Sequence, residues 1–398
     1  MWKSLRIVVL AVCAVAVFSQ EQQTKKPIAN LRASAEQGNS AAQFELGYKY
    51  RTGDGIDQDV TLAFFWYREA AGQGHDLAIY RLGEMYRAGI GVGRNYAEAL
   101  KWFTKGAELG DTFSQLMIGH MYAEGEGVSK SEKEAVTWYQ RSAEKGNPSA
   151  QYTLATAYFF GTGIPQDLEV AVGLYRKSAE QGYSAAQWML GNLYRNGQGV
   201  KIDYPQSVNW YRKAAEQGDA IAQFNLGVMY GKGEGVPKDA AQAVVWYRKA
   251  ADQGDANAQF NLGNMYNNGD GVPKDAAQAV VWYRKAADQG DATAQFNLGT
   301  MYSTGDGVPK DAVQAVVWYR KAADQGDANA QSNLGAMYVI GVGVTKDLVA
   351  SYMWRNLAAA QGNEIGKTAR DALEKDMTPA QIAEAQKLSR EWKPKKSK

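Results

Sequence analysis

The chain of 398 residues contains a single cysteine, Cys13, and only two histidines, His75 and His120. One cysteine cannot form a disulfide framework, and so few thiol and imidazole groups leave too few ligands for a typical zinc site. The motifs of zinc proteases (His-Glu-x-x-His), of serine hydrolases (Gly-x-Ser-x-Gly) and of calcium-binding loops are missing too. We therefore expect no metal, no cofactor and no enzymatic activity.

Long apolar runs are also scarce, and the most prominent one lies at the start of the chain. Lys3 and Arg6 precede an apolar stretch from Ile7 to Phe18, which is too short to form a stable membrane anchor. A short basic region followed by such a stretch is typical of a secretory signal peptide. We therefore predict a signal peptide over residues 1–19 and an exported protein, either periplasmic or secreted.

The end of this leader leaves alternatives open. Cleavage after Ser19 would make Gln20 the first residue and would remove Cys13, so the remaining chain would carry no thiol. One alternative is lipid attachment at Cys13, because the preceding Leu10-Ala11-Val12 loosely resembles a bacterial lipobox. The other is retention of the apolar stretch as an uncleaved anchor.

An excess of charge of one sign is absent as well. The chain has 44 Lys and Arg against 42 Asp and Glu, and loss of Lys3 and Arg6 with the leader would leave 42 − 42 = 0. A balanced charge gives no general attraction to the phosphate backbone, so we expect no nucleic-acid partner.

Glycine, in contrast, is abundant and strictly spaced. Ten glycines follow one another at intervals of 36 residues: Gly38, Gly74, Gly110, Gly146, Gly182, Gly218, Gly254, Gly290, Gly326 and Gly362. The pattern between them recurs nine times. Repeats of this length form helical solenoids, because a unit of two helices buries its apolar face only by stacking on its neighbours.

The unit from Gly218 to Gly254, with Gly218 as position 0, shows how one repeat folds. Asp219 is the expected N-cap of a first helix over about 220–232, on which apolar residues recur with helical spacing. Gly227 lies inside this helix, where glycine costs about 1 kcal/mol relative to alanine, so we expect another backbone or a ring to cross there. Two further glycines, Gly233 and Gly235, are typical of a turn.

A second helix follows, with Asp239 as its N-cap. Its apolar residues fall at i, i+3, i+4, i+7 and i+8, and eight of the nine repeats carry a tryptophan on this face. The periodic Trp-Tyr pair could stack on sugars, but its place on the same stripe as small alanines favours a role in the core.

These residues resemble the Sel1-like repeat, a relative of the tetratricopeptide repeat. The resemblance rests on Gly-Asp-Ala-x-Ala-Gln-Phe-Asn-Leu-Gly-x-Met-Tyr, on the Gly-x-Gly-Val-Pro loop and on Trp-Tyr-Arg-Lys-Ala-Ala, and it spans about 28–362. It implies an all-α fold, a right-handed solenoid superhelix of antiparallel helix pairs, and a role as an adaptor for protein complexes. A cysteine-rich branch of the family is described as acting on penicillin-like compounds, but this chain lacks the cysteine pairs of that branch.

The two ends of the repeat array differ from its interior. Residues 20–37 hold a partial repeat helix, nine repeats occupy 38–361, and capping helices are expected over 362–393. The last helix is predicted to begin with Thr378 as N-cap and Pro379 at its first position, and to cover the open end of the array with Ile382, Ala385 and Leu388. Residues 394–398 form a basic tail that we expect to be solvated.

Comparison of the nine repeats with one another indicates where a partner would bind. Positions 3, 7, 10 and 14 vary most, and their spacing places them on one stripe of the first helix, away from its buried side. In stacked helix pairs the first helices line the inner, concave surface. The variation could also be simple drift of exposed positions.

We name these positions the first-helix stripe and predict that it binds a protein or peptide. The predicted contact residues are Leu77, Arg81, Phe113, Met117, His120, Phe160 and Met189 in an apolar half, and Asn225, Asn261, Asn264, Asn297 and Asn333 in an amide-rich half. The amide row also fits a glycan, so a glycan- or peptidoglycan-binding module is one alternative, and a weak hydrolase of the lactamase-like branch is a second.

Overall fold

The computed structural model describes residues 28–395. The predicted signal peptide, its cleavage site and Cys13 lie outside these residues, as do Lys396 and Lys398. None of the helices in the described part has the length and apolar character needed to cross a membrane.

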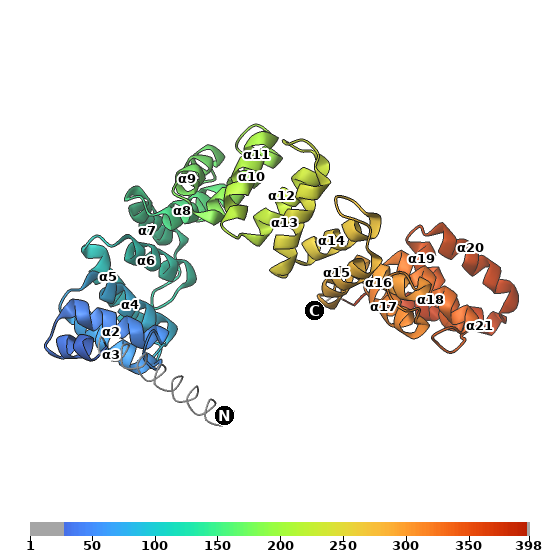
Figure 1. Ribbon diagram of the computed structural model, residues 1–398, viewed down its shortest axis with the longest axis horizontal. Coiled ribbons are helices and arrows are strands. Elements are labelled where there is room, and N and C mark those ends of the chain that lie inside the picture. Colours follow the sequence, from blue (N-terminus) through green and yellow to red (C-terminus); the bar gives the residue numbers. More distant parts are fainter. Residues whose placement is uncertain (1–27, 396–398) are drawn as a thin grey trace, which may run out of the picture. The chain divides into compact units, whose positions relative to one another are not determined.

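The described chain is built from helices and contains no strand between residues 28 and 395. Residues 28–36 are helical and precede the first full pair. The nine pairs of the repeats are α2 (Ser40–Thr52) and α3 (Val60–Gly72), α4 (Asp76–Ala88) and α5 (Tyr96–Glu108), α6 (Thr112–Glu124) and α7 (Glu132–Glu144), α8 (Pro148–Phe160) and α9 (Leu168–Glu180), α10 (Ser184–Asn196) and α11 (Tyr204–Glu216), α12 (Ala220–Lys232) and α13 (Ala240–Asp252), α14 (Ala256–Asn268) and α15 (Ala276–Asp288), α16 (Ala292–Thr304) and α17 (Ala312–Asp324), and α18 (Ala328–Ile340) and α19 (Leu348–Ala360). The expected all-α solenoid of paired helices is confirmed (Figure 1).

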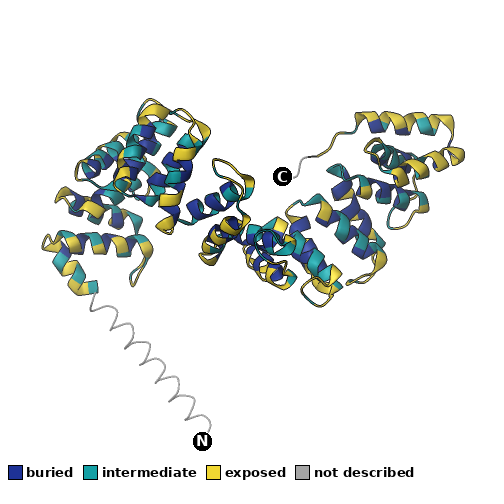
Figure 2. Ribbon diagram, turned by 90° about the horizontal axis from the view of Figure 1, so that it is seen from above, coloured by how far each residue is buried: buried dark blue, intermediate teal, exposed yellow. Residues whose placement is uncertain are grey.

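The described chain forms two compact units, each with dense contacts among its own residues. The boundary between the two units falls in the fifth repeat. One unit holds residues up to 186 together with 198–200, and the other holds 187–197 and everything from residue 201. In each unit the buried residues lie on the facing sides of neighbouring helices, and exposed residues cover the outer sides (Figure 2). The cores are therefore a series of small clusters, each shared by successive helix pairs, as expected for a repeat array.

The helix ends follow the predicted capping pattern. The Asp219 carboxylate accepts a hydrogen bond from the Ala222 amide at 2.7 Å, and Asp239 does the same for Gln242 at 2.9 Å. His75 takes the N-cap place of α4, where its Nδ1 accepts from the Ala78 amide at 3.3 Å. These side chains satisfy backbone donors that the first turn of each helix leaves free.

The mid-helix glycine lies where an aromatic ring crosses, as predicted. A Cβ on Gly227 would lie 2.7 Å from the ring of Tyr247 on the paired helix α13. Glycine in the first helix therefore lets the second helix place its tyrosine ring directly against the backbone, and Tyr247 is buried there.

A pair of glutamines also joins the two ends of most repeats. A buried glutamine on the first helix accepts a hydrogen bond from a glutamine that follows the second helix. The pairs are Gln43–Gln73, Gln151–Gln181, Gln187–Gln217, Gln223–Gln253, Gln259–Gln289, Gln295–Gln325 and Gln331–Gln361, with separations of 2.7 to 2.9 Å. Each bond satisfies an amide oxygen that would otherwise be buried without a partner.

Two repeats break this pairing in different ways. In the second repeat both members are apolar, Ile79 and Leu109. In the third repeat the first-helix glutamine is present as Gln115, but Lys145 stands where the second glutamine would be. The buried Oε1 of Gln115 therefore has no hydrogen-bond partner. The Lys145 ammonium instead reaches the Gly110 carbonyl at 3.5 Å.

Lys145→Gln is expected to stabilise the protein by about 1 kcal/mol, because it supplies the missing donor to Gln115. The new amide would also replace the lost bond to Gly110, since Gln289 reaches the equivalent Gly254 carbonyl at 2.9 Å. The urea midpoint of the full chain measures the change. Leu109→Gln is the control, because its partner Ile79 offers no acceptor. An equal gain from both variants would contradict the explanation.

The C-terminal helices pack against the last repeat. α20 (Glu364–Leu373), a short 3-10 turn η1 (Glu374–Asp376) and α21 (Pro379–Glu391) follow α19, and Thr378 caps α21 through a capping box with Gln381. Ala385 is fully buried in a cluster with Tyr352 of α19, and Ile382 packs against that cluster. Leu388 is partly buried.

The start of the basic tail is not free in solution. The Lys395 amide donates to the Asp324 carbonyl at 2.7 Å, and its ammonium lies 2.7 Å from the Asp324 carboxylate. Trp392 packs edge-on against Trp354 at 6.2 Å between ring centroids. Lys395 remains largely exposed to solvent, as expected for the basic tail, but these contacts tie the start of the tail to the last repeats.

Candidate functional site

The first-helix stripe lies at the surface of both units. Its position 3 is exposed in most repeats, position 14 is exposed at Phe160 and Ile340, and positions 7 and 10 are mostly half-buried. The stripe therefore has exposed ends and a more sheltered middle along each first helix.

The apolar residues of the stripe are unusually exposed. Leu77, Phe113 and Phe160 have exposed fractions of 59%, 53% and 65%. Phe113 packs against Tyr80 of the preceding repeat at 5.9 Å between centroids, whereas Phe160 packs on its neighbour Phe159 at 4.9 Å. Phe113 lies in the first turn of α6 and Phe160 is the last residue of α8, so the structure places them at opposite ends of the stripe.

The two methionines and the histidine of this half are less accessible. Met117, Met189 and His120 are half-buried. The His120 Nδ1 lies 3.2 Å from the Tyr139 hydroxyl of α7. Burial lowers the pKa of His120, and the nearby Arg87 guanidinium acts in the same direction, so the ring is held neutral near pH 7. This histidine is a packed part of the stripe wall.

The amide-rich half is half-buried, and some of its side chains already interact with tyrosine hydroxyls. Asn225, Asn261, Asn297 and Asn333 recur every 36 residues and are half-buried. Asn264 accepts a hydrogen bond from the Tyr283 hydroxyl at 2.6 Å. Asn261 and Asn264 line a shallow hollow of about 290 Å³ with Tyr247 and Lys232. The structure thus brings two of the five predicted amides together.

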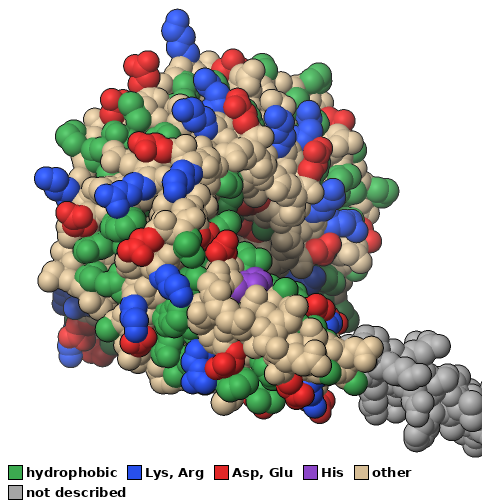
Figure 3. All heavy atoms as spheres, turned by 90° about the vertical axis from the view of Figure 1, so that its left-hand side faces the viewer, with side chains coloured by type: hydrophobic (Ala, Val, Ile, Leu, Met, Phe, Trp, Pro, Cys, Tyr) green, Lys and Arg blue, Asp and Glu red, His purple; other side chains and the backbone are tan. Residues whose placement is uncertain are grey.

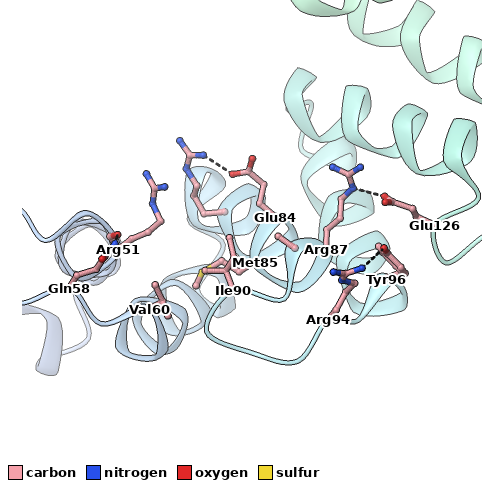
Figure 4. A pocket seen from close by; sticks show the side chains of 12 residues that line it. Arg51, Gln58, Val60, Glu84, Met85, Arg87, Ile90, Arg94, Tyr96 and Glu126 are labelled. Atoms are coloured by element: carbon pink, nitrogen blue, oxygen red, sulfur yellow. Dashed lines mark hydrogen bonds and ion pairs between the residues drawn. The ribbon is translucent and has the colours of Figure 1, made fainter. Parts of the chain in front are cut away.

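The structure also shows a cavity that the sequence did not reveal. It has a volume of about 620 Å³ and lies where the first three repeats meet, next to stripe residues Arg81 and Glu84 (Figure 4). Three further arginines line it: Arg51 and Arg87 from the last turns of α2 and α4, and Arg94 from the loop before α5. We name it the arginine cavity.

Two of the four arginines in this cavity have acidic partners. Arg81 donates to Glu84 at 2.6 Å, and Arg87 donates to Glu126 of the next repeat at 2.5 Å. Tyr80 also donates to Glu84, at 2.9 Å. Glu84 is therefore a structural partner of Arg81 and Tyr80.

The sequence signal for this cavity was weak. Arg51 and Arg87 occupy position 13, which carries arginine in the first, second and fifth repeats and was not part of the variable stripe. Arg94 lies in a loop that was interpreted only as a turn. Position 13 follows position 10 by one helical turn, so side chains there lie beside the stripe, and that spacing could have identified them.

The face of the molecule shown in Figure 3 carries no strong field of one sign. On the face shown in Figure 3, Lys and Arg side chains alternate with Asp and Glu, and apolar side chains are scattered among them. Within residues 28–395 there is also no group of three or more His, Cys, Asp or Glu that could hold a metal ion.

Comparison with known proteins identifies the repeat. The model of the Sel1 repeat matches nine consecutive segments: 40–75, 76–111, 112–147, 148–183, 184–219, 220–255, 256–291, 292–327 and 328–363. The chain belongs to the Sel1 repeat family. Nine repeats were predicted from the glycine spacing, and both the number and the family are confirmed.

Solved structures of Sel1 repeat proteins resemble this chain along most of its length. The protein c5321, described as a protective antigen of uropathogenic Escherichia coli strains with an SLR fold, is 35% identical, with 92% of this chain and 94% of c5321 covered and a TM-score of 0.50. A Sel1 repeat protein from Oxalobacter formigenes is also 35% identical, with 78% and 90% covered and a TM-score of 0.59. A search of curated proteins found no match.

The Sel1 repeat array is a scaffold of the tetratricopeptide-like type, a class of module typical of protein interactions. None of the comparisons indicates an enzyme family. The chemistry of the first-helix stripe and the arginine cavity is that of contact surfaces, with apolar rings, amides and guanidinium groups.

Proposed function

We propose that this Sel1 repeat protein is a non-enzymatic scaffold, exported to the periplasm or the medium, that binds a protein or peptide partner through the concave first-helix face. The observation that carries the proposal is the exposure of Leu77, Phe113 and Phe160 on helices whose other large apolar side chains are buried or half-buried. Large apolar side chains that remain in water favour an interaction surface, because covering them lowers the free energy.

The variation between repeats supports the same conclusion. The buried face of each repeat is nearly constant, whereas positions 3, 7, 10 and 14 change from one repeat to the next. An array of identical repeats would present the same surface at every repeat and could not fix where a partner binds along it. Because the stripe carries different side chains in different repeats, it can recognise one partner in a single register.

Capture from a cell-envelope extract tests the proposal. The full chain is compared with the double variant Phe113→Ser, Phe160→Ser, which is expected to lose a captured protein at least about tenfold, as hot-spot truncations do. Phe65→Ser is the matched control, because Phe65 is an exposed phenylalanine on the second helix α3. Equal capture by all three proteins would contradict the proposal, and capture of a purified glycan instead would favour the alternative module.

The exported location is tested separately. Mass spectrometry of the protein from its native cells gives the first residue, and Gln20 is the expected start. Retention of Met1 on a cytoplasmic protein would contradict this part of the proposal.

A further inference from the structure

The arginine cavity holds more positive charge than its acidic residues balance. Four guanidinium groups, Arg51, Arg81, Arg87 and Arg94, line it together with two carboxylates, which leaves 4 − 2 = 2 positive charges. Because Glu84 and Glu126 are each bound by one arginine, the surplus belongs to Arg51 and Arg94.

Arg51 is the less satisfied of these two. It has no acidic partner in the part of the chain that the structure describes, and its Nε atom is buried without a hydrogen-bond partner. In Figure 4 no dashed line reaches Arg51, whereas the neighbouring arginines are joined to partners. A buried donor on a charged group costs free energy until an acceptor reaches it.

Arg94 is also weakly hydrogen-bonded, and the nearby Tyr67 offers no negative charge to Arg51. The only hydrogen bond of Arg94 among the described residues is a long one, 3.4 Å, to the Tyr96 hydroxyl. The Tyr67 hydroxyl is also buried without a hydrogen-bond partner, and burial raises its pKa even though the nearby Arg51 guanidinium acts in the opposite direction. The Tyr67 hydroxyl is therefore protonated and cannot supply the negative charge that Arg51 lacks.

The cavity walls are not polar throughout. Val60, Met85 and Ile90 line it beside the arginines. A ligand with a negative group and an adjacent aliphatic group would pair its charge with Arg51 and Arg94 and place the aliphatic group against these side chains. A carboxylate fits the planar fork of a guanidinium. A peptide can carry such a carboxylate and an aliphatic side chain close together.

We infer that the arginine cavity binds a carboxylate of the peptide partner, flanked by an aliphatic side chain, with Arg51 and Arg94 as its principal contacts. This inference rests on the proposed function and names the chemistry of the ligand at one end of the first-helix stripe. The carboxylate comes either from an Asp or Glu side chain or from the end of a chain, and the two sources share the same contacts.

Selection of a random-peptide display library on the full chain tests the inference. The selected peptides are expected to carry Asp or Glu, or a free C-terminus, next to an aliphatic residue. A synthetic copy of the best peptide is then compared with its Glu-to-Gln or Asp-to-Asn form and with its C-terminal amide. Loss of affinity in the first comparison identifies a side-chain carboxylate, and loss in the second identifies a terminal one.

Variants of the chain complete the test by calorimetry. Arg51→Gln and Arg94→Gln are each expected to weaken peptide binding at least about tenfold, as loss of a charged hydrogen bond does. Arg51→Lys should keep part of the affinity, because it retains the charge without the fork. Arg68→Gln is the control with the same charge change, since Arg68 lies on the outer side of α3, paired with Glu69.

The outcomes separate this inference from the proposed function. Peptides whose affinity depends on Phe113 but not on Arg51 or Arg94 would overturn the inference and leave the proposed function intact. Selected peptides without a carboxylate, or no enrichment at all, would also overturn it. Insensitivity to Phe113, Arg51 and Arg94 together would count against both.

Discussion

Gly307→Ala is expected to destabilise the second unit by at least about 3 kcal/mol. Gly307 closes the loop between α16 and α17 with φ of +69°, and a Cβ there would lie 2.3 Å from the carbonyl carbon and oxygen of Ala276, the first residue of α15. The added methyl would therefore meet rigid backbone of the preceding repeat as well as an unfavourable φ. Urea unfolding of the full chain measures the loss.

Gly290→Ala separates these two costs. Gly290 also has a positive φ, +99°, but a Cβ there has no atom within 4 Å. This variant should lose only the strain of the backbone conformation, about 1 to 2 kcal/mol. Hydrogen exchange should show faster opening around α15–α17 in Gly307→Ala alone. Similar losses in the two variants would show that the contact between repeats contributes nothing.

Trp282→Ala is expected to cost about 3 to 5 kcal/mol, because it removes a large ring from the contact between two repeats. Trp282 is 6% exposed and belongs to a cluster with Val244 and Tyr247 of the preceding repeat and with Leu262 of its own repeat. Its Nε1 is buried without a hydrogen-bond partner, so the ring stabilises by packing, and Lys285 covers its face at 3.9 Å.

Val281→Ala is the control for this prediction. Val281 is the adjacent residue of α15 and is 46% exposed, so its truncation should change stability by no more than about 0.5 kcal/mol. Repeat arrays can lose all-or-none unfolding, so hydrogen exchange of α13–α15 is measured beside the urea midpoint. Comparable effects of the two variants would show that the tryptophan is not part of the core.

The fold was predictable because the same local sequence pattern recurs in each of the nine repeats. The caps at Asp219 and Asp239, the helix bounds and the ring that crosses Gly227 were all expected from one repeat. These features depend on residues close in sequence or on the paired helix, where periodicity and glycine placement are informative.

Contacts between repeats were harder to predict. The loop glycine at Gly307 was interpreted as turn chemistry, and its contact with Ala276 appears only once repeats are stacked. The return of Lys395 to Asp324 and the arginine cavity share this origin, and the glutamine pairs, although each lies within one repeat, also depend on residues far apart in sequence. Each joins residues that are 30 or more positions apart, and nothing in their own helix requires the contact.

Hydrogen exchange of the full chain with and without a captured partner tests the central claim most directly. Partner binding through the first-helix face predicts slower exchange in α4, α6 and α8, with α5, α7 and α9 unchanged. Protection confined to the second helices, with α4, α6 and α8 exchanging at their free rates, would contradict the account.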